Sequence, residues 1–160
     1  MSTKMQFIKR LTQARNEVRA LLPGIDIHMK IYPAWTIKEV LAHLAGWDDA
    51  TILALKAYIT GEIPPTPADR GIDPYNAQTV AERSSLNYDQ IVREWELVRE
   101  QLIPILHQID EEKLGVVIVS PWGDTITIEG LLNIMIRHEE EHAKVIRERM
   151  ANPDRPLQAH

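Results

Sequence analysis

The segment from Ile128 to Met150 carries a one-sided helical pattern that limits the folds open to this chain. Its apolar residues recur at three- and four-residue spacing, and two histidines lie in the same stripe, which comprises Leu131, Ile134, Met135, His138, His142, Val145 and Ile146. Residues at this spacing share one face of an α-helix. Such a helix must bury that face against other helices, so the two imidazoles on the same face are expected to be buried as well. The segment therefore predicts a helical domain with polar groups in its core.

Two further helices are expected before residue 62. The first covers about residues 3–22, because its apolar side chains have helical spacing and Pro23-Gly24 ends it. The second covers about residues 36–60 and begins with a capping box, in which Thr36 and Glu39 each bond the other's backbone N–H. The segment between the two helices is expected to be a loop.

A long connection follows the second helix. Residues 64–67 contain three prolines and cannot continue a helix. Asp73-Pro74 is a helix start, with Asp at the cap and Pro at the first position. The helical pattern then extends to about Ile109, with a bend or break expected near residues 84–87. This connection is predicted to be a surface crossover and not a domain boundary.

The sequence of residues 116–119 and 125–128 predicts a short hairpin. Two strands alone do not make a sheet domain. We therefore predict an all-α fold, a four-helix bundle with one long crossover and a small β-hairpin before the last helix. Residues 1–150 are expected to form a single domain and residues 151–160 a flexible tail.

Composition removes several classes of function. The 160-residue chain has no cysteine, which excludes disulfides and thiolate metal sites and leaves histidine and carboxylate as the strong ligands. Its net charge of −5 provides no basic surface for nucleic acid. No apolar stretch approaches the roughly 20 residues that span a membrane, and no signal peptide is visible. We expect a cytoplasmic protein without nucleic-acid or membrane partners.

His43 is the third histidine expected to face the core. It shares a helix face with Val40, Trp47 and Ala50 through three-, four- and seven-residue spacing. Three imidazoles on facing helices, with open coordination positions, would suit Zn²⁺, Ni²⁺ or Fe²⁺. The alternative is that each histidine only hydrogen-bonds to a core carboxylate or carbonyl. No role is expected for the other three histidines, which are His28, His107 and His160.

The run from His138 to His142 also matches the H-E-x-x-H pattern of zinc metalloproteases. In that reading Glu139 is the general base and a third ligand follows further along the chain. Only 18 residues follow His142 and their sole histidine is His160, which disfavours a protease. Residues 139–141 are expected on the solvated helix surface, from which Glu139 could still act as a base beside a ligand.

The segment Trp35–Leu44, followed about 95 residues later by His138-x-x-x-His142 on a final helix, resembles the DinB/YfiT superfamily. This superfamily comprises four-helix bundles with metal-dependent activities. The resemblance covers nearly the whole chain in order and spacing. It implies that His43, His138 and His142 are the metal ligands.

A second resemblance concerns the segment Asp73–Asn76, which precedes a long helical region. It is similar to members of the superfamily related to the colibactin self-protection proteins. On that analogy, Trp47 and Asn76 are expected near the pocket.

The resemblance implies a metal-dependent enzyme of the hydrolase or thiol S-transferase type that acts on a small molecule. Activities in the superfamily include thiol-dependent S-transfer, a mycothiol-dependent isomerisation and hydrolysis of a reactive genotoxin. A low-molecular-weight thiol cosubstrate would fit a chain without cysteine. The alternative is a non-catalytic protein of the same fold that binds a small molecule for stress protection. A third possibility is an interaction module whose spare apolar face pairs with a copy of itself. A homodimer is compatible with all three functions and does not distinguish them.

Overall fold

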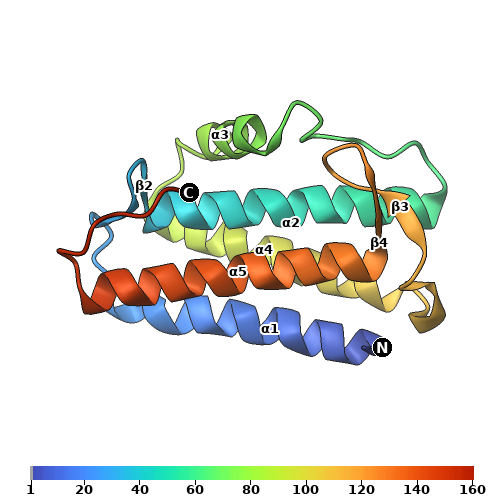
Figure 1. Cartoon of the computed structure of the whole chain (residues 1–160), viewed down its shortest axis with the longest axis horizontal. Helices are drawn as coiled ribbons and strands as arrows, with labels where there is room; N and C mark the ends of the chain where they lie inside the picture. The colour runs from blue at the N-terminus through green and yellow to red at the C-terminus, as the bar shows by residue number, and fades with distance from the viewer. Residues whose placement is uncertain (1) are drawn as a thin grey trace.

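The computed structural model describes residues 2–160, and four long helices form a bundle (Figure 1). The four are α1 (Lys4–Leu21), α2 (Ile37–Thr60), α4 (Tyr88–His107) and α5 (Ile128–Ala151). Helix α2 packs on α4 and α5, and α1 packs on α5. In Figure 1, α1 and α5 run in one direction and α2 and α4 in the other. The predicted four-helix bundle is confirmed.

Most helix ends form where the sequence indicates them. Thr3 caps α1 in a capping box with Gln6, and the 3₁₀ turn η1 (Leu22–Gly24) follows the helix. Gly61 ends α2 with φ at 73°, a left-handed conformation that glycine adopts at low cost. The predicted capping box at Thr36 is wrong. The Thr36 hydroxyl donates to the Glu39 carboxylate at 2.5 Å and makes no bond to the backbone of the first turn.

The long crossover contains the helix α3 (Ile72–Glu82), which packs against α2. It begins after Gly71, two residues before the predicted cap at Asp73, and the break before α4 occurs at residues 83–87 as expected. The two helices approach so closely at Gly46 that an added Cβ would overlap the Thr79 side chain. The Tyr75 hydroxyl donates to the Gly46 carbonyl at 2.6 Å. These contacts fix α3 over the middle of α2.

Two small ribbons flank the bundle. The predicted hairpin is formed by β3 (Val117–Val119) and β4 (Thr125–Thr127), which follow the 3₁₀ turn η2 (Glu111–Lys113). The segment expected to be a loop between α1 and α2 contains a second antiparallel pair, β1 (Lys30–Tyr32) and β2 (Trp35–Thr36). These strands of three and two residues are too short to show the alternation of apolar and polar residues by which a strand is predicted from sequence.

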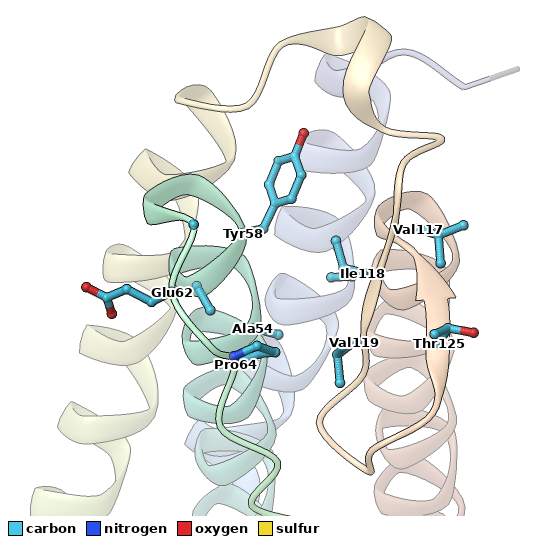
Figure 2. A pocket seen from close by; sticks show the side chains of 10 residues that line it. Ala54, Tyr58, Glu62, Pro64, Val117, Ile118, Val119 and Thr125 are labelled. Carbon is cyan, nitrogen blue, oxygen red and sulfur yellow. The ribbon is translucent and has the colours of Figure 1, made fainter.

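The β3–β4 hairpin and the end of α2 enclose a cavity of about 340 Å³ (Figure 2). Small and apolar side chains make up most of its wall, and Glu62 is its carboxylate. The residues labelled around it are Ala54, Tyr58, Glu62, Pro64, Val117, Ile118, Val119 and Thr125. No group of three or more potential metal ligands is found here within residues 2–160. The one group of potential metal ligands among residues 2–160 lies elsewhere in the bundle.

One charged side chain from each long helix meets in the core. Arg15 on α1 and Arg99 on α4 both bond to Asp48 on α2 and to Glu139 on α5. Two positive and two negative charges balance, as buried charges require. Although burial opposes its ionisation, the two guanidiniums hold the pKa of Asp48 below its usual value. The prediction that Glu139 lies on the solvated surface is wrong, since its residue exposure is 2%.

Among the described residues, no helix has both the length and the apolar character needed to cross a membrane.

Candidate metal centre

Three histidines from two facing helices converge in the bundle. His43 comes from α2, and His138 and His142 lie one turn apart on α5. The Nε2 atom of His43 lies 2.8 Å from that of His138 and 3.2 Å from that of His142. The Nε2 atoms of His138 and His142 are 3.0 Å apart. The structure therefore brings together the three residues that the sequence pattern and the resemblance single out.

A fourth imidazole joins them from the tail. The Nε2 atom of His160 lies 3.2 Å from that of His142, and the four residues each present a ring nitrogen within 4.8 Å of the others. The sequence reasoning missed His160, because a residue beyond the last helix has no helical register that could place it. The flexibility expected of residues 151–160 stays a prediction.

Burial keeps the three helix-borne imidazoles neutral. Loss of hydration is the largest effect on each, and the neighbouring histidines add to it at His43 and His142. The pKa of His43 falls far below its usual value, and that of His142 falls well below it. Burial above all, followed by His160, lowers the pKa of His138 to about 4. At neutral pH each imidazole therefore has one nitrogen with a free lone pair.

The donor set fits a divalent cation. Neutral imidazoles have one N–H each, so three Nε2 atoms around one point cannot all satisfy one another. A Zn²⁺ ion with Zn–N bonds of about 2.0–2.1 Å would hold tetrahedral ligand nitrogens roughly 3.3 Å apart, close to the separations of 2.8–3.2 Å seen here. The Nδ1 atom of His43 is buried and has no hydrogen-bond partner among residues 2–160.

Tyr32 on β1 orients one member of the cluster. Its hydroxyl oxygen lies 2.7 Å from Nδ1 of His142. If Nε2 presents its lone pair to the cluster, Nδ1 carries the proton and donates it to the Tyr32 oxygen. Burial raises the pKa of Tyr32, so the phenol keeps its proton at neutral pH. The β1–β2 ribbon that sequence reasoning missed thus supplies a partner to a candidate ligand.

A cavity of about 310 Å³ opens over the cluster. Trp47 and Asn76, the two residues expected near the pocket, lie in its wall, where the Trp47 indole donates to the Asn76 side-chain oxygen at 2.8 Å. Trp122, in the turn between β3 and β4, lines it as well. The rest of the wall is His43, Ile72, Ile134, Met135, His138 and His160. A mostly apolar cleft with a few polar groups at its base is typical of small-molecule sites.

Glu139 does not belong to this site. Its carboxylate accepts bonds from Arg15 at 2.5 Å and from Arg99 at 2.7 Å, and it is buried in the charged network. Both oxygens of this carboxylate are occupied by guanidinium N–H donors. The metalloprotease reading, which needs Glu139 as a base, therefore has no support in this geometry.

The fold and the cluster define a four-helix-bundle protein with a buried histidine site on two facing helices. A sequence profile described as the DinB superfamily matches residues 10–146, and the chain belongs to that superfamily. The resemblance seen in the sequence is thus confirmed. No curated protein matches the chain significantly by sequence.

Solved structures with the same fold have little sequence in common with this chain. One, a sibling lethal factor precursor named DfsB, matches with a TM-score of 0.80 at 17% identity over 98% of this chain and 99% of its own. The colibactin self-resistance protein ClbS, solved with double-stranded DNA, has a TM-score of 0.78 at 11% identity, covering 94% and 97%. A mycothiol-dependent maleylpyruvate isomerase has a TM-score of 0.71 at 21% identity, covering 91% and 63%. At these identities the likeness concerns the fold.

Proposed function

We propose that the chain is a small metal-dependent enzyme, in which His43, His138 and His142 hold one divalent cation. The observation that carries this proposal is the convergence of three Nε2 atoms, from the buried His43 and His142 and the half-buried His138, next to a mostly apolar cavity that His43 and His138 line. Zn²⁺, Ni²⁺ and Fe²⁺ all suit an imidazole donor set. When bound, such an ion polarises a substrate oxygen or lowers the pKa of a coordinated water or thiol.

The residues of this chain would bind and orient the reacting molecule. Trp47 and Trp122 provide flat apolar walls that exclude water, while the Asn76 amide offers a polar group beside them. With a metal on Nε2 of His142, the Tyr32 oxygen would accept a hydrogen bond from Nδ1–H of that ring and hold it in place. The cavity volume of about 310 Å³ suits a small molecule.

The reaction type that we propose is hydrolysis or transfer of a low-molecular-weight thiol to a small electrophile. The chain has no cysteine, so a thiol would enter as a cosubstrate. One structural neighbour is a mycothiol-dependent isomerase, which supports thiol use at this type of site. The expected absence of a nucleic-acid partner rests on the net charge of −5 and stays a prediction, while ClbS was solved with double-stranded DNA.

The second candidate function is non-catalytic binding of a small molecule for protection. ClbS, a self-resistance protein of the same fold, favours this candidate. So does the fourth imidazole, because a site with four protein ligands leaves a tetrahedral ion no position for a substrate.

Metal analysis of untagged protein tests the proposal. We expect one divalent ion per chain, as isolated or after loading with Zn²⁺ or Ni²⁺. His142→Ala should bind less than a tenth of that amount, whereas the control His107→Ala, at the end of α4, should bind as the wild type does. A wild-type ratio near zero after loading would contradict the proposal.

Cobalt substitution separates the two candidate functions. In the wild type, a change of the Co²⁺ absorption spectrum on adding azide or 2-mercaptoethanol would indicate an exchangeable position and favour the enzyme. A spectrum that no small anion or thiol alters, even at high concentration, would favour non-catalytic binding.

A further inference from the structure

His160 packs among the aromatic rings that surround the cluster. Its ring stacks on that of His142, with the ring centroids 4.9 Å apart and an interplanar angle of 19°. The ring centroids of Trp35 and Tyr32 lie 4.5 Å and 5.0 Å away. Figure 1 shows the tail leaving the end of α5 and turning back to α2. His160 therefore closes over the histidines from the solvent side.

The bend of the tail is held by contacts that do not involve His160. The buried Arg149 donates from Nε to the Lys30 carbonyl at 3.1 Å and from Nη1 to the Arg155 carbonyl at 2.5 Å. Arg155 also pairs with Glu148 at 3.6 Å. One arginine thus ties strand β1, helix α5 and the tail together, and it directs the last residues back toward the cluster.

We propose that His160 is a displaceable fourth ligand, which closes the metal site at rest and leaves it when a small thiol or anion binds. The inference rests on the proposed metal site. The contrast in burial indicates which ligand leaves, since His43 and His142 are buried between helices and His160 is exposed at the end of a tail. Breaking the contact of an exposed residue outside the helices disturbs less packing than moving a helix.

The cavities on either side of His160 support the same inference. His160 and Asn76 both line the 310 Å³ cavity over the cluster and a second cavity of about 340 Å³ beside Tyr32, Trp35 and Asp73. His160 therefore stands between the two spaces. When its imidazole moves away, the two cavities become one larger pocket with a free position above His43, His138 and His142.

The test compares Co²⁺-loaded wild type with His160→Ala and with the control His107→Ala. All three should bind one Co²⁺ per chain, because the three helix-borne histidines His43, His138 and His142 remain in each. The wild type and the control should share one absorption spectrum. His160→Ala should have an altered spectrum and should bind azide at least tenfold more tightly, since no imidazole competes for the position.

Each other result contradicts a different step. If His160→Ala binds Co²⁺ with the wild-type spectrum and azide affinity, His160 is not a ligand, and the three-histidine site stands. If it binds no Co²⁺ while the wild type does, His160 is an essential ligand and not a displaceable one. If the wild type and both variants bind no Co²⁺, the proposed metal site fails, and the inference with it.

A second variant tests the tail while keeping the imidazole. Arg149→Gln removes the guanidinium that ties the tail to β1. We expect unchanged Co²⁺ stoichiometry and an azide affinity at least threefold higher than in the wild type. An unchanged azide affinity would overturn the anchoring role of Arg149.

Discussion

Two buried polar clusters lie next to each other along the same helices, and they differ in how well their groups are satisfied. Asp48 and Glu139 follow His43 and His138 by five residues and one residue on α2 and α5. The charged cluster of Arg15, Asp48, Arg99 and Glu139 balances its own charges. The imidazole cluster gathers neutral rings whose nitrogens face one another.

The difference indicates the role of each cluster. A self-satisfied network needs nothing from outside, and it joins the four helices at one level of the bundle. The imidazole nitrogens converge with too few protons to hydrogen-bond one another, so some of them remain unsatisfied until a cation binds. We infer that the charged cluster holds the helices in the register that the imidazole cluster needs.

Removal of one charge from the charged cluster should have the largest effect on stability. Asp48→Asn leaves two buried guanidiniums with one carboxylate, and breaking a buried pair costs about 3–5 kcal/mol of unfolding free energy. Urea unfolding measures this loss. The control is Glu96→Gln, which breaks the partly exposed Arg19–Glu96 pair and should cost less than about 1 kcal/mol. Equal losses in both variants would remove the distinction between the buried network and a surface pair.

Acid should destabilise the metal-free protein through the imidazole cluster. Burial lowers the pKa of His138 to about 4. Because its unfolded pKa is about 6.5, the unfolded state takes up the proton first as the pH falls, so stability is retained above pH 6.5 and lost toward pH 4. That loss amounts to about 3 kcal/mol from His138 alone.

The measurement is urea unfolding of wild type and His138→Ala in the presence of a chelator, at pH 7.5 and pH 4. The stability difference between the two proteins should shift by about 3 kcal/mol in favour of the variant at the lower pH. A difference that stays constant with pH would show that His138 is not held neutral by the fold.

Zinc should stabilise the fold through the imidazole cluster alone. At a free Zn²⁺ concentration 100 times its Kd, the unfolding free energy of the wild type should rise by about 2.7 kcal/mol. His142→Ala should gain nothing at that concentration, and Glu96→Gln should gain as much as the wild type. Stabilisation of His142→Ala to the same degree would place the binding elsewhere on the chain.

Removal of the Tyr32 hydroxyl should weaken metal binding without abolishing it. Tyr32→Phe deletes the oxygen 2.7 Å from His142 Nδ1, and losing a partner of a metal ligand typically costs about 10–100-fold in affinity. Competition with a chromogenic chelator measures the Zn²⁺ affinity. Tyr58→Phe, at the cavity below the β3–β4 hairpin, is the matched control and should retain the wild-type affinity. Equal affinities in the two variants would mean that Tyr32 does not support the ligand.

The sequence predicts the bundle well because helical spacing and helix ends are local signals. The predicted end of the second helix at residue 60 and the predicted start of the last helix at Ile128 are where the structure has them. His43, His138 and His142 could be singled out because each shares a helix face with apolar neighbours. Whether these three bind a metal stays a proposal.

What the sequence did not reveal depends on contacts between distant segments. Glu139 resembles a surface residue on its own helix, and its burial becomes intelligible only with Arg15 and Arg99 from two other helices. The position of His160 depends on the tail that Arg149 holds. The tail is not helical, so its sequence has no periodic pattern that could predict where His160 lies. Tyr32 reaches His142 from a strand of three residues, which is too short for an alternation pattern.

A crystal structure of Zn²⁺-loaded protein, measured at the zinc absorption edge, would show whether the imidazole cluster is a metal site, as we claim. We predict one anomalous peak per chain among the Nε2 atoms of His43, His138 and His142, with Zn–N distances of about 2.0–2.1 Å. Full occupancy of zinc at any other place, with the three imidazoles left without an ion, would contradict the claim.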